Sequence, residues 1–343
     1  MTQKIDISTS TLIRFIVILL SLGFIYVIRD VLVLLFLVII IVASLSPTVD
    51  RWAKLITRPG AVISVFVLLA LALVGVSLIV IPPLVDQIQQ FAQNLPGLVE
   101  SYSKSDSSYL KTAADVIQNN LSSVTSSLSN LGGTLFSKTL GVVSGIVAAF
   151  TVLVLTFYLL LEEGGLQRMY RGAVPEDLHA RYSEMTKKIA AKLGAWLRGQ
   201  LLLMLLVGIL TTIGLLIIGS PYALTLGVWA GLTEGIPFIG PLLGAVPGVA
   251  VNLAESPIQG ILSIVIYLIV QQLENQVLVP KVMGRAVGLN PVIVILAILI
   301  GQKLYGLFGV VLAVPLAAVI SVVVADWQLI KDSIAINSRK PKS

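Results

Sequence analysis

The stretch PFIGPLLGAVP, residues 237–247, lies inside a long apolar region and contains three prolines and two glycines. Proline lacks the backbone N–H that a helix interior uses, and glycine weakens a helix. In hydrocarbon the freed backbone groups find no water, so such a break is tolerated only against protein or a water-filled cavity. The stretch therefore predicts a broken helix at membrane depth, and the break is expected to help build a polar site.

The composition indicates a helical membrane protein. The 343 residues are 57% hydrophobic and only 12% charged, about half the charged fraction of a soluble domain. Long continuous apolar runs favour membrane helices over the alternating strands of a barrel. The chain has no cysteine, and its single histidine is His179, so we expect no cofactor and no metal site. The net charge of +6 is spread over loops, which favours membrane topology over nucleic-acid binding.

The apolar runs predict about eight membrane segments in an all-α polytopic protein. Six runs can form simple spans, at residues 12–28, 31–45, 60–81, 140–161, 200–218 and 258–279. Two longer regions, 222–253 and 291–325, are interrupted by Gly and Pro and are predicted to be broken, re-entrant hairpins. The loop charges place the N-terminus, the 163–198 segment and the C-terminus in the cytoplasm.

These segments divide the chain into six parts. They are membrane helices 1–3 (1–83), a helical extracytoplasmic segment (84–138), membrane helix 4 (139–162), a cytoplasmic amphipathic segment (163–198), a transport core with two hairpins (199–327) and a cytoplasmic tail (328–343).

Two of the loop segments carry helical patterns. The outer segment repeats apolar residues at 4-3-4-3-4 spacing, which indicates a helix that packs on its own domain or pairs between protomers of a homo-oligomer. The residues are Ile117, Leu121, Val124, Leu128, Leu131 and Leu135. The inner segment reads as an amphipathic helix at the membrane surface. Its Lys187, Lys188 and Lys192 either touch anionic lipid or form a solvated basic face.

A second copy of the broken stretch lies at residues 306–315, GLFGVVLAVP. Gly240 corresponds to Gly309 and Leu243 to Leu312 at a constant separation of 69 residues. Paired discontinuous segments point to a transport site, although Gly and Pro can also simply allow tight helix packing. Charge bias favours hairpins that dip into the membrane from opposite faces, as in an inverted repeat. The predicted breaks are Pro237, Gly240, Pro241, Pro247, Gly306, Gly309 and Pro315.

Polar residues at membrane depth are candidates for substrate or ion binding. Glu234 and Lys303 occupy equivalent positions near the two hairpin tips, where they are expected either to form a structural ion pair or to bind cargo. Gln271, Glu274 and Asn275 share one helical face at i, i+3 and i+4 spacing. Their oxygens suit a hydrated cation or a polyhydroxylated solute, and the alternative is a polar cap at the membrane interface.

At these residues the sequence resembles the AI-2E (autoinducer-2 exporter-like) family of bacterial membrane transporters. The resemblance rests on IPFIGPLLGAVPG (236–248), QQLENQVLVPKVMG (271–284), GLFGVVLAVPLAA (306–318) and Arg198-Gly199-Gln200. It implies about eight membrane segments and a place in the bacterial cytoplasmic (inner) membrane. It also implies transport, either export of autoinducer-2 or Na⁺(Li⁺)/H⁺ antiport.

The sequence thus predicts a secondary transporter that works by alternating access in a lipid bilayer. Its expected cargo is either a small polar solute or a monovalent cation exchanged for a proton. No G-x-x-x-x-G-K-[ST] motif is present, so no ATP-driven engine is visible. A passive channel and a membrane scaffold are the alternatives. An enzyme is not expected, because H-E-x-x-H is absent and no pair of aspartates lies within the apolar runs.

Overall fold

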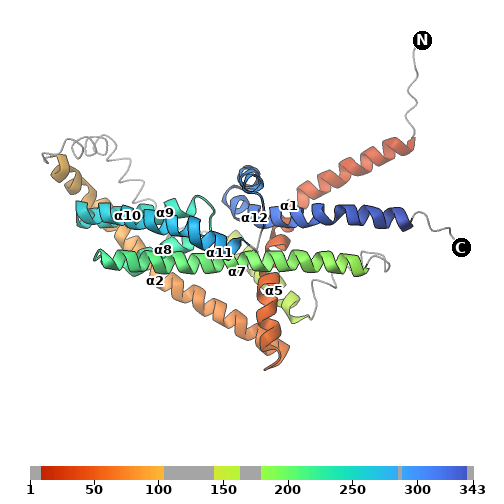
Figure 1. Cartoon of the computed structure of the whole chain (residues 1–343), viewed down its shortest axis with the longest axis horizontal. Coiled ribbons are helices and arrows are strands. Elements are labelled where there is room, and N and C mark those ends of the chain that lie inside the picture. Colours follow the sequence, from red (N-terminus) through yellow and green to blue (C-terminus); the bar gives the residue numbers. More distant parts are fainter. Residues whose placement is uncertain (1–8, 104–142, 163–178, 285–287, 338–343) are drawn as a thin grey trace, which may run out of the picture.

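The computed structural model describes residues 9–103, 143–162, 179–284 and 288–337, and every element in these ranges is helical. Figure 1 shows the elements in their chain colours. They are α1 (Thr9–Trp52), α2 (Arg58–Ser103), α5 (Val143–Leu161), α7 (His179–Ile217), α8 (Ala223–Thr233), α9 (Gly240–Glu255), α10 (Pro257–Leu273), the π-helix η2 (Glu274–Leu278), α11 (Val279–Met283) and α12 (Pro291–Asn337).

Within the described ranges, five helical stretches are long and apolar enough to cross a membrane. They are Ile13–Trp52, Arg58–Pro83, Tyr182–Ile217, Pro257–Met283 and Pro291–Asp326, and Val147–Leu161 and Ala223–Thr233 are shorter apolar helices. Many of their large apolar side chains are exposed, as expected for a surface that faces lipid. The helical class of the protein is therefore confirmed. The number of eight segments and the re-entrant course of the hairpins stay predictions.

The first two predicted spans form a single helix, α1. Only Arg29 and Asp30 separate the two apolar runs, and neither is a Gly or Pro that would end a helix. The two side chains instead remain exposed on the helix surface, with Arg29 Nε 3.7 Å from Asp30 Oδ1.

α7 joins the predicted amphipathic segment and the fifth span without interruption. Figure 1 shows it extending across the molecule. Two lysines of its basic face reach α12: Lys188 Nζ lies 3.2 Å from Asp326 Oδ2, and Lys192 Nζ lies 3.2 Å from Ser321 Oγ, while Lys187 is exposed. Lys188 also pairs with Glu184, one turn earlier, at 3.2 Å.

α2 continues as one helix past the predicted segment boundary at residue 83 to Ser103. The outer coiled-coil-like pattern, from Ile117 to Leu135, lies outside the described residues.

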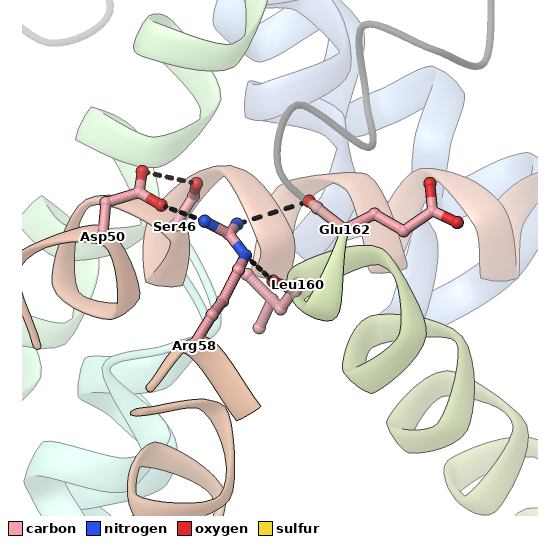
Figure 2. Close-up of polar contacts among 5 residues, drawn as sticks. All are labelled: Ser46, Asp50, Arg58, Leu160 and Glu162. Carbon is pink, nitrogen blue, oxygen red and sulfur yellow. Dashed lines mark hydrogen bonds and ion pairs between the residues drawn. The ribbon is translucent and has the colours of Figure 1, made fainter. Parts of the chain in front are cut away.

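The N-terminal helices are held together by one arginine (Figure 2). Arg58, at the start of α2, donates from Nε to the carbonyl oxygen of Leu160 at 2.9 Å and from Nη2 to that of Glu162 at 3.3 Å. Its Nη1 lies 3.0 Å from Oδ1 of Asp50 on α1, and the same carboxylate accepts a hydrogen bond from Ser46. A guanidinium at the C-terminal end of α5 satisfies carbonyls that the helix leaves unpaired. Arg58 therefore connects α1, α2 and α5.

α8 and α9 form the first hairpin, and its turn contains several of the predicted break residues. Pro237 lies in the turn, Phe238 adopts a positive φ of 64°, and Gly240 and Pro241 begin α9. A Cβ on Gly240 would collide with the carbonyl oxygen of Thr233, so only glycine allows the two arms to approach this closely.

Pro247 lies inside α9 and does not end it, contrary to its predicted role as a break. Proline offers no N–H to the carbonyl of residue i−4, which is Leu243. The indole Nε1 of Trp229, on α8, donates to that carbonyl at 3.0 Å instead. A bond between the two arms thus replaces the one that the helix lost.

The two arms of α12 form the second hairpin, with non-helical backbone at Tyr305 and at Gly306, whose φ is 56°. Gly301 and Gly309 face each other across this kink, and a Cβ on Gly309 would strike the carbonyl oxygen of Gly301. Gly309 therefore contacts the incoming arm as its predicted counterpart Gly240 does, which supports the repeat. Pro315 lies inside the second arm, like Pro247 in the first hairpin, and does not break it.

Candidate functional site

A cavity of about 1320 Å³ lies between the first hairpin and its neighbours. Its wall comes from α7, the α8–α9 turn, α9, the continuous stretch α10–η2–α11, Gly288 and Leu289 before α12, and both arms of α12, the second through Val314. Most lining residues are apolar. The polar ones are few, and they include Gln200, Glu234, Tyr267, Gln271, Glu274 and Asn275.

Glu234 is positioned by the first hairpin. It follows the last residue of α8, and its N–H still donates to Ala230 O at 3.1 Å. Its own carbonyl accepts a 2.8 Å hydrogen bond from Nε2 of Gln200 on α7. The side chain is only 6% exposed, and its Oε2 has no hydrogen-bond donor in the described structure. A buried carboxyl oxygen without a donor is costly, which makes Glu234 a functional candidate.

Glu274 begins the π-helix η2, which interrupts the sixth predicted span. A π-turn inserts one residue into a helix and is frequent at functional sites. Gln271 Nε2 donates to Glu274 Oε2 at 3.0 Å, so these two side chains share a face as predicted. Asn275 also lines the cavity, and Glu274 is 6% exposed.

Glu234 and Glu274 are both buried in the wall of this cavity, and their carboxyl groups are close enough to interact. Two carboxylates at such a distance cannot both be ionised at low cost, and a carboxylate has no proton to donate. A hydrogen bond between them requires one shared proton. The arrangement can therefore hold a proton or, when the proton leaves, a cation.

Lys303 does not pair with Glu234. It is exposed, does not line the cavity, and makes no ion pair in the described structure. The tip of the second hairpin instead approaches α1, where the Arg29 guanidinium lies 6.0 Å from the ring centroid of Tyr305 and 4.4 Å from that of Tyr26. Equivalence within a repeat does not bring two tips together when each hairpin packs on a different neighbour. Gly306, Gly309 and Pro315 also lie outside the cavity wall.

Three further lining residues carried little signal in the sequence. Trp196 precedes the RGQ motif on α7, Tyr267 lies within an apolar run, and Phe238 lies in the hairpin turn. An aromatic residue in an apolar run reads as ordinary packing, and only the fold shows that these rings border a cavity. Tyr267 packs directly against Gly248 of α9, and its hydroxyl has no hydrogen-bond partner in the described ranges.

Comparison with known proteins covers nearly the whole chain. The family described as "AI-2E family transporter" matches residues 15–329, which include every residue of the cavity wall. The chain is 31% identical over 289 residues to "Putative transport protein YueF" of Bacillus subtilis (strain 168), which is 80% of this chain and 78% of that protein. It is 29% identical over 299 residues to "Putative permease PerM" of Escherichia coli (strain K12), covering 81% and 79%.

Proposed function

The chain belongs to the AI-2E family of transporters, and from this premise we propose that it is a secondary transporter that exchanges cargo for a proton at the Glu234–Glu274 pair. The observation that supports this most is the contact between two buried carboxyl groups in the wall of a large cavity. A site that can hold either a proton or a positive charge gives exchange without ATP.

Alternating access follows from where the two carboxyls are attached. Glu234 belongs to the turn of the first hairpin and Glu274 to η2, so the pair comes apart whenever the hairpin moves relative to α10. Together the two carboxyls share a proton, and this sharing ends when they separate. The family resemblance suggests two cargo classes for this site. One is a small polar solute of the autoinducer-2 type, held by Gln271 and Asn275, and the other is a monovalent cation.

Membrane placement completes the proposal. The protein would lie in the bacterial inner membrane as a homo-oligomer, with both termini cytoplasmic and the two hairpins dipping in from opposite faces. The chain has no cysteine, so single-cysteine variants need no altered background. In intact cells, a membrane-impermeant maleimide should label Glu255→Cys and spare Lys281→Cys. Labelling of both residues from outside would contradict this topology.

The proton-exchange step can be tested in proteoliposomes that contain the pH dye pyranine. Outward gradients of Na⁺, Li⁺ or autoinducer-2 should each be compared for a pH change that depends on the protein. Glu234→Gln and Glu274→Gln should abolish any such change, because a glutamine cannot ionise. Glu255→Gln, an exposed carboxylate at the end of α9 that does not line the cavity, is the matched control and should keep full activity.

If both cavity variants exchange protons as fast as the wild type, the carboxyl pair is not the coupling site. A passive channel would give fast flux with no pH change, and single-channel recording distinguishes it.

A further inference from the structure

The chemistry of the cavity wall narrows the class of cargo. We propose that the cavity binds a monovalent organic cation with a large apolar body, and that this cation displaces the proton shared by Glu234 and Glu274. The inference rests on the proposed function, because it uses the same cavity and the same carboxyl pair.

The charge of the wall selects for positive ligands. Among the described residues that line the cavity, Glu234 and Glu274 are acidic and none is basic. The other polar lining groups include the amides of Gln200, Gln271 and Asn275 and the phenol of Tyr267, none of which is basic. An anionic solute would meet the negative charge of the Glu234–Glu274 pair in an apolar surrounding, which is strongly unfavourable.

The rest of the wall is built for an apolar body. Three aromatic residues, Trp196, Phe238 and Tyr267, line the cavity together with aliphatic side chains from α9, α10 and α12. Aromatic rings beside a carboxylate are the groups that recognise quaternary ammonium ions, through cation–π attraction and burial of the alkyl surface. Phe238 is 71% exposed on the turn that also carries Glu234, so its ring is available to a ligand.

A bare metal ion fits this wall poorly. A dehydrated cation needs a shell of about six oxygen ligands, whereas the described cavity wall is made mostly of apolar side chains. The cavity of about 1320 Å³ is also larger than the ~300–1,000 Å³ of typical small-molecule pockets. The body of an organic cation can fill this volume. With an alkali ion bound, water would fill most of the cavity and lie against apolar side chains.

The exchange step balances without another reactant. On cation binding, the O–H bond of the shared carboxylic acid breaks and its proton passes to water. Both side chains then become carboxylates, and the positive charge of the bound cation replaces that of the proton. Nothing is oxidised or reduced. Binding should therefore strengthen as pH rises, with about one proton released per cation bound.

The test uses two probes of the same shape and opposite charge, tetraphenylphosphonium and tetraphenylborate. Binding of each to the purified full-length protein in detergent is measured by equilibrium dialysis, with empty micelles subtracted. We expect the phosphonium to bind about tenfold or more tightly than the borate, and its affinity to rise between pH 6 and pH 8. Trp196→Leu should weaken phosphonium binding by about tenfold. Glu234→Gln/Glu274→Gln should remove the pH dependence, while Glu255→Gln should leave it unchanged.

Equal binding of the two probes to the wild-type protein would overturn the inference, and this comparison needs no variant to fold. Binding of the phosphonium that survives in the double variant, with its pH dependence intact, would also overturn it. The proposed function fails separately: proton exchange driven by Na⁺ without phosphonium binding keeps the transporter and rejects the organic cation. If phosphonium binds but proteoliposomes show no transport, the binding site is supported and the proposed transport function is wrong.

Discussion

The hydrogen bond from Trp229 to the carbonyl of Leu243 gives a quantitative test of how the first hairpin is held together. Pro247 cannot donate to that carbonyl, so the indole Nε1, at 3.0 Å, is its donor in the structure. Trp229→Phe keeps an aromatic ring and removes only the donor. A carbonyl left without a partner costs about 1–3 kcal/mol. Hydrogen bonds between membrane helices average about 0.6 kcal/mol and reach about 1.7.

A double-mutant cycle isolates this bond. In a Pro247→Ala background, the backbone N–H that the substitution restores can donate to Leu243, so loss of the indole donor should matter less. We expect Trp229→Phe to cost about 1–2 kcal/mol in the wild type, with a coupling energy of about 1 kcal/mol to position 247. The free energy of unfolding is measured by SDS titration in mixed micelles, followed by circular dichroism at 222 nm. Trp52→Phe, whose indole makes no hydrogen bond in the described structure, is the matched control.

The reasoning is refuted if Trp229→Phe costs the same with proline or alanine at position 247. That result would mean that water, or relaxation of the helix, satisfies the carbonyl of Leu243 without the indole.

Three further stability predictions use the same unfolding assay. Phe238→Gly should be about 1 kcal/mol more stable than Phe238→Ala, because only glycine adopts a positive φ without strain; equal stabilities would exclude that strain. Gly309→Leu should cost more than about 3 kcal/mol or prevent folding, since its Cβ meets the carbonyl of Gly301, whereas Gly75→Leu, with open space around it, should be tolerated. Arg58→Lys should cost about 1–2 kcal/mol, because the three donors of an ammonium lie on one nitrogen and cannot reach the three acceptors that Nε, Nη1 and Nη2 contact separately. A fully stable lysine variant would show that charge alone is enough there.

The breaks and glycine contacts of the two hairpins could be predicted because they follow from local chemistry. A turn that contains Pro237 and a close approach at Gly240 are consequences of which residues lack an N–H or a Cβ. The same rule misjudged Pro247, because the bond that compensates for it comes from Trp229 on another helix. A hydrogen bond between two helices cannot be predicted from the local sequence of either one.

The composition of the cavity could be predicted only in part. The face shared by Gln271, Glu274 and Asn275 follows from helical spacing. The partner of Glu234 does not, because it depends on how α8 and α10 pack against α7. The repeat suggested Lys303 as the partner of Glu234, but the packing of the helices brings Glu274 to it instead. Two helix ends were also predicted wrongly. Charged residues suggested boundaries within α1 and α7, but both helices continue through those positions.

Because α7 is uninterrupted, it connects two distant contacts through one continuous helix. Gln200 on this helix holds the carbonyl of Glu234 at the cavity, and Lys188 on the same helix holds Asp326 of α12. At 1.5 Å per residue the two attachment points are about 18 Å apart on one rod. If α7 tilts as a rigid body about Gln200, Lys188 must therefore move relative to Asp326 as well.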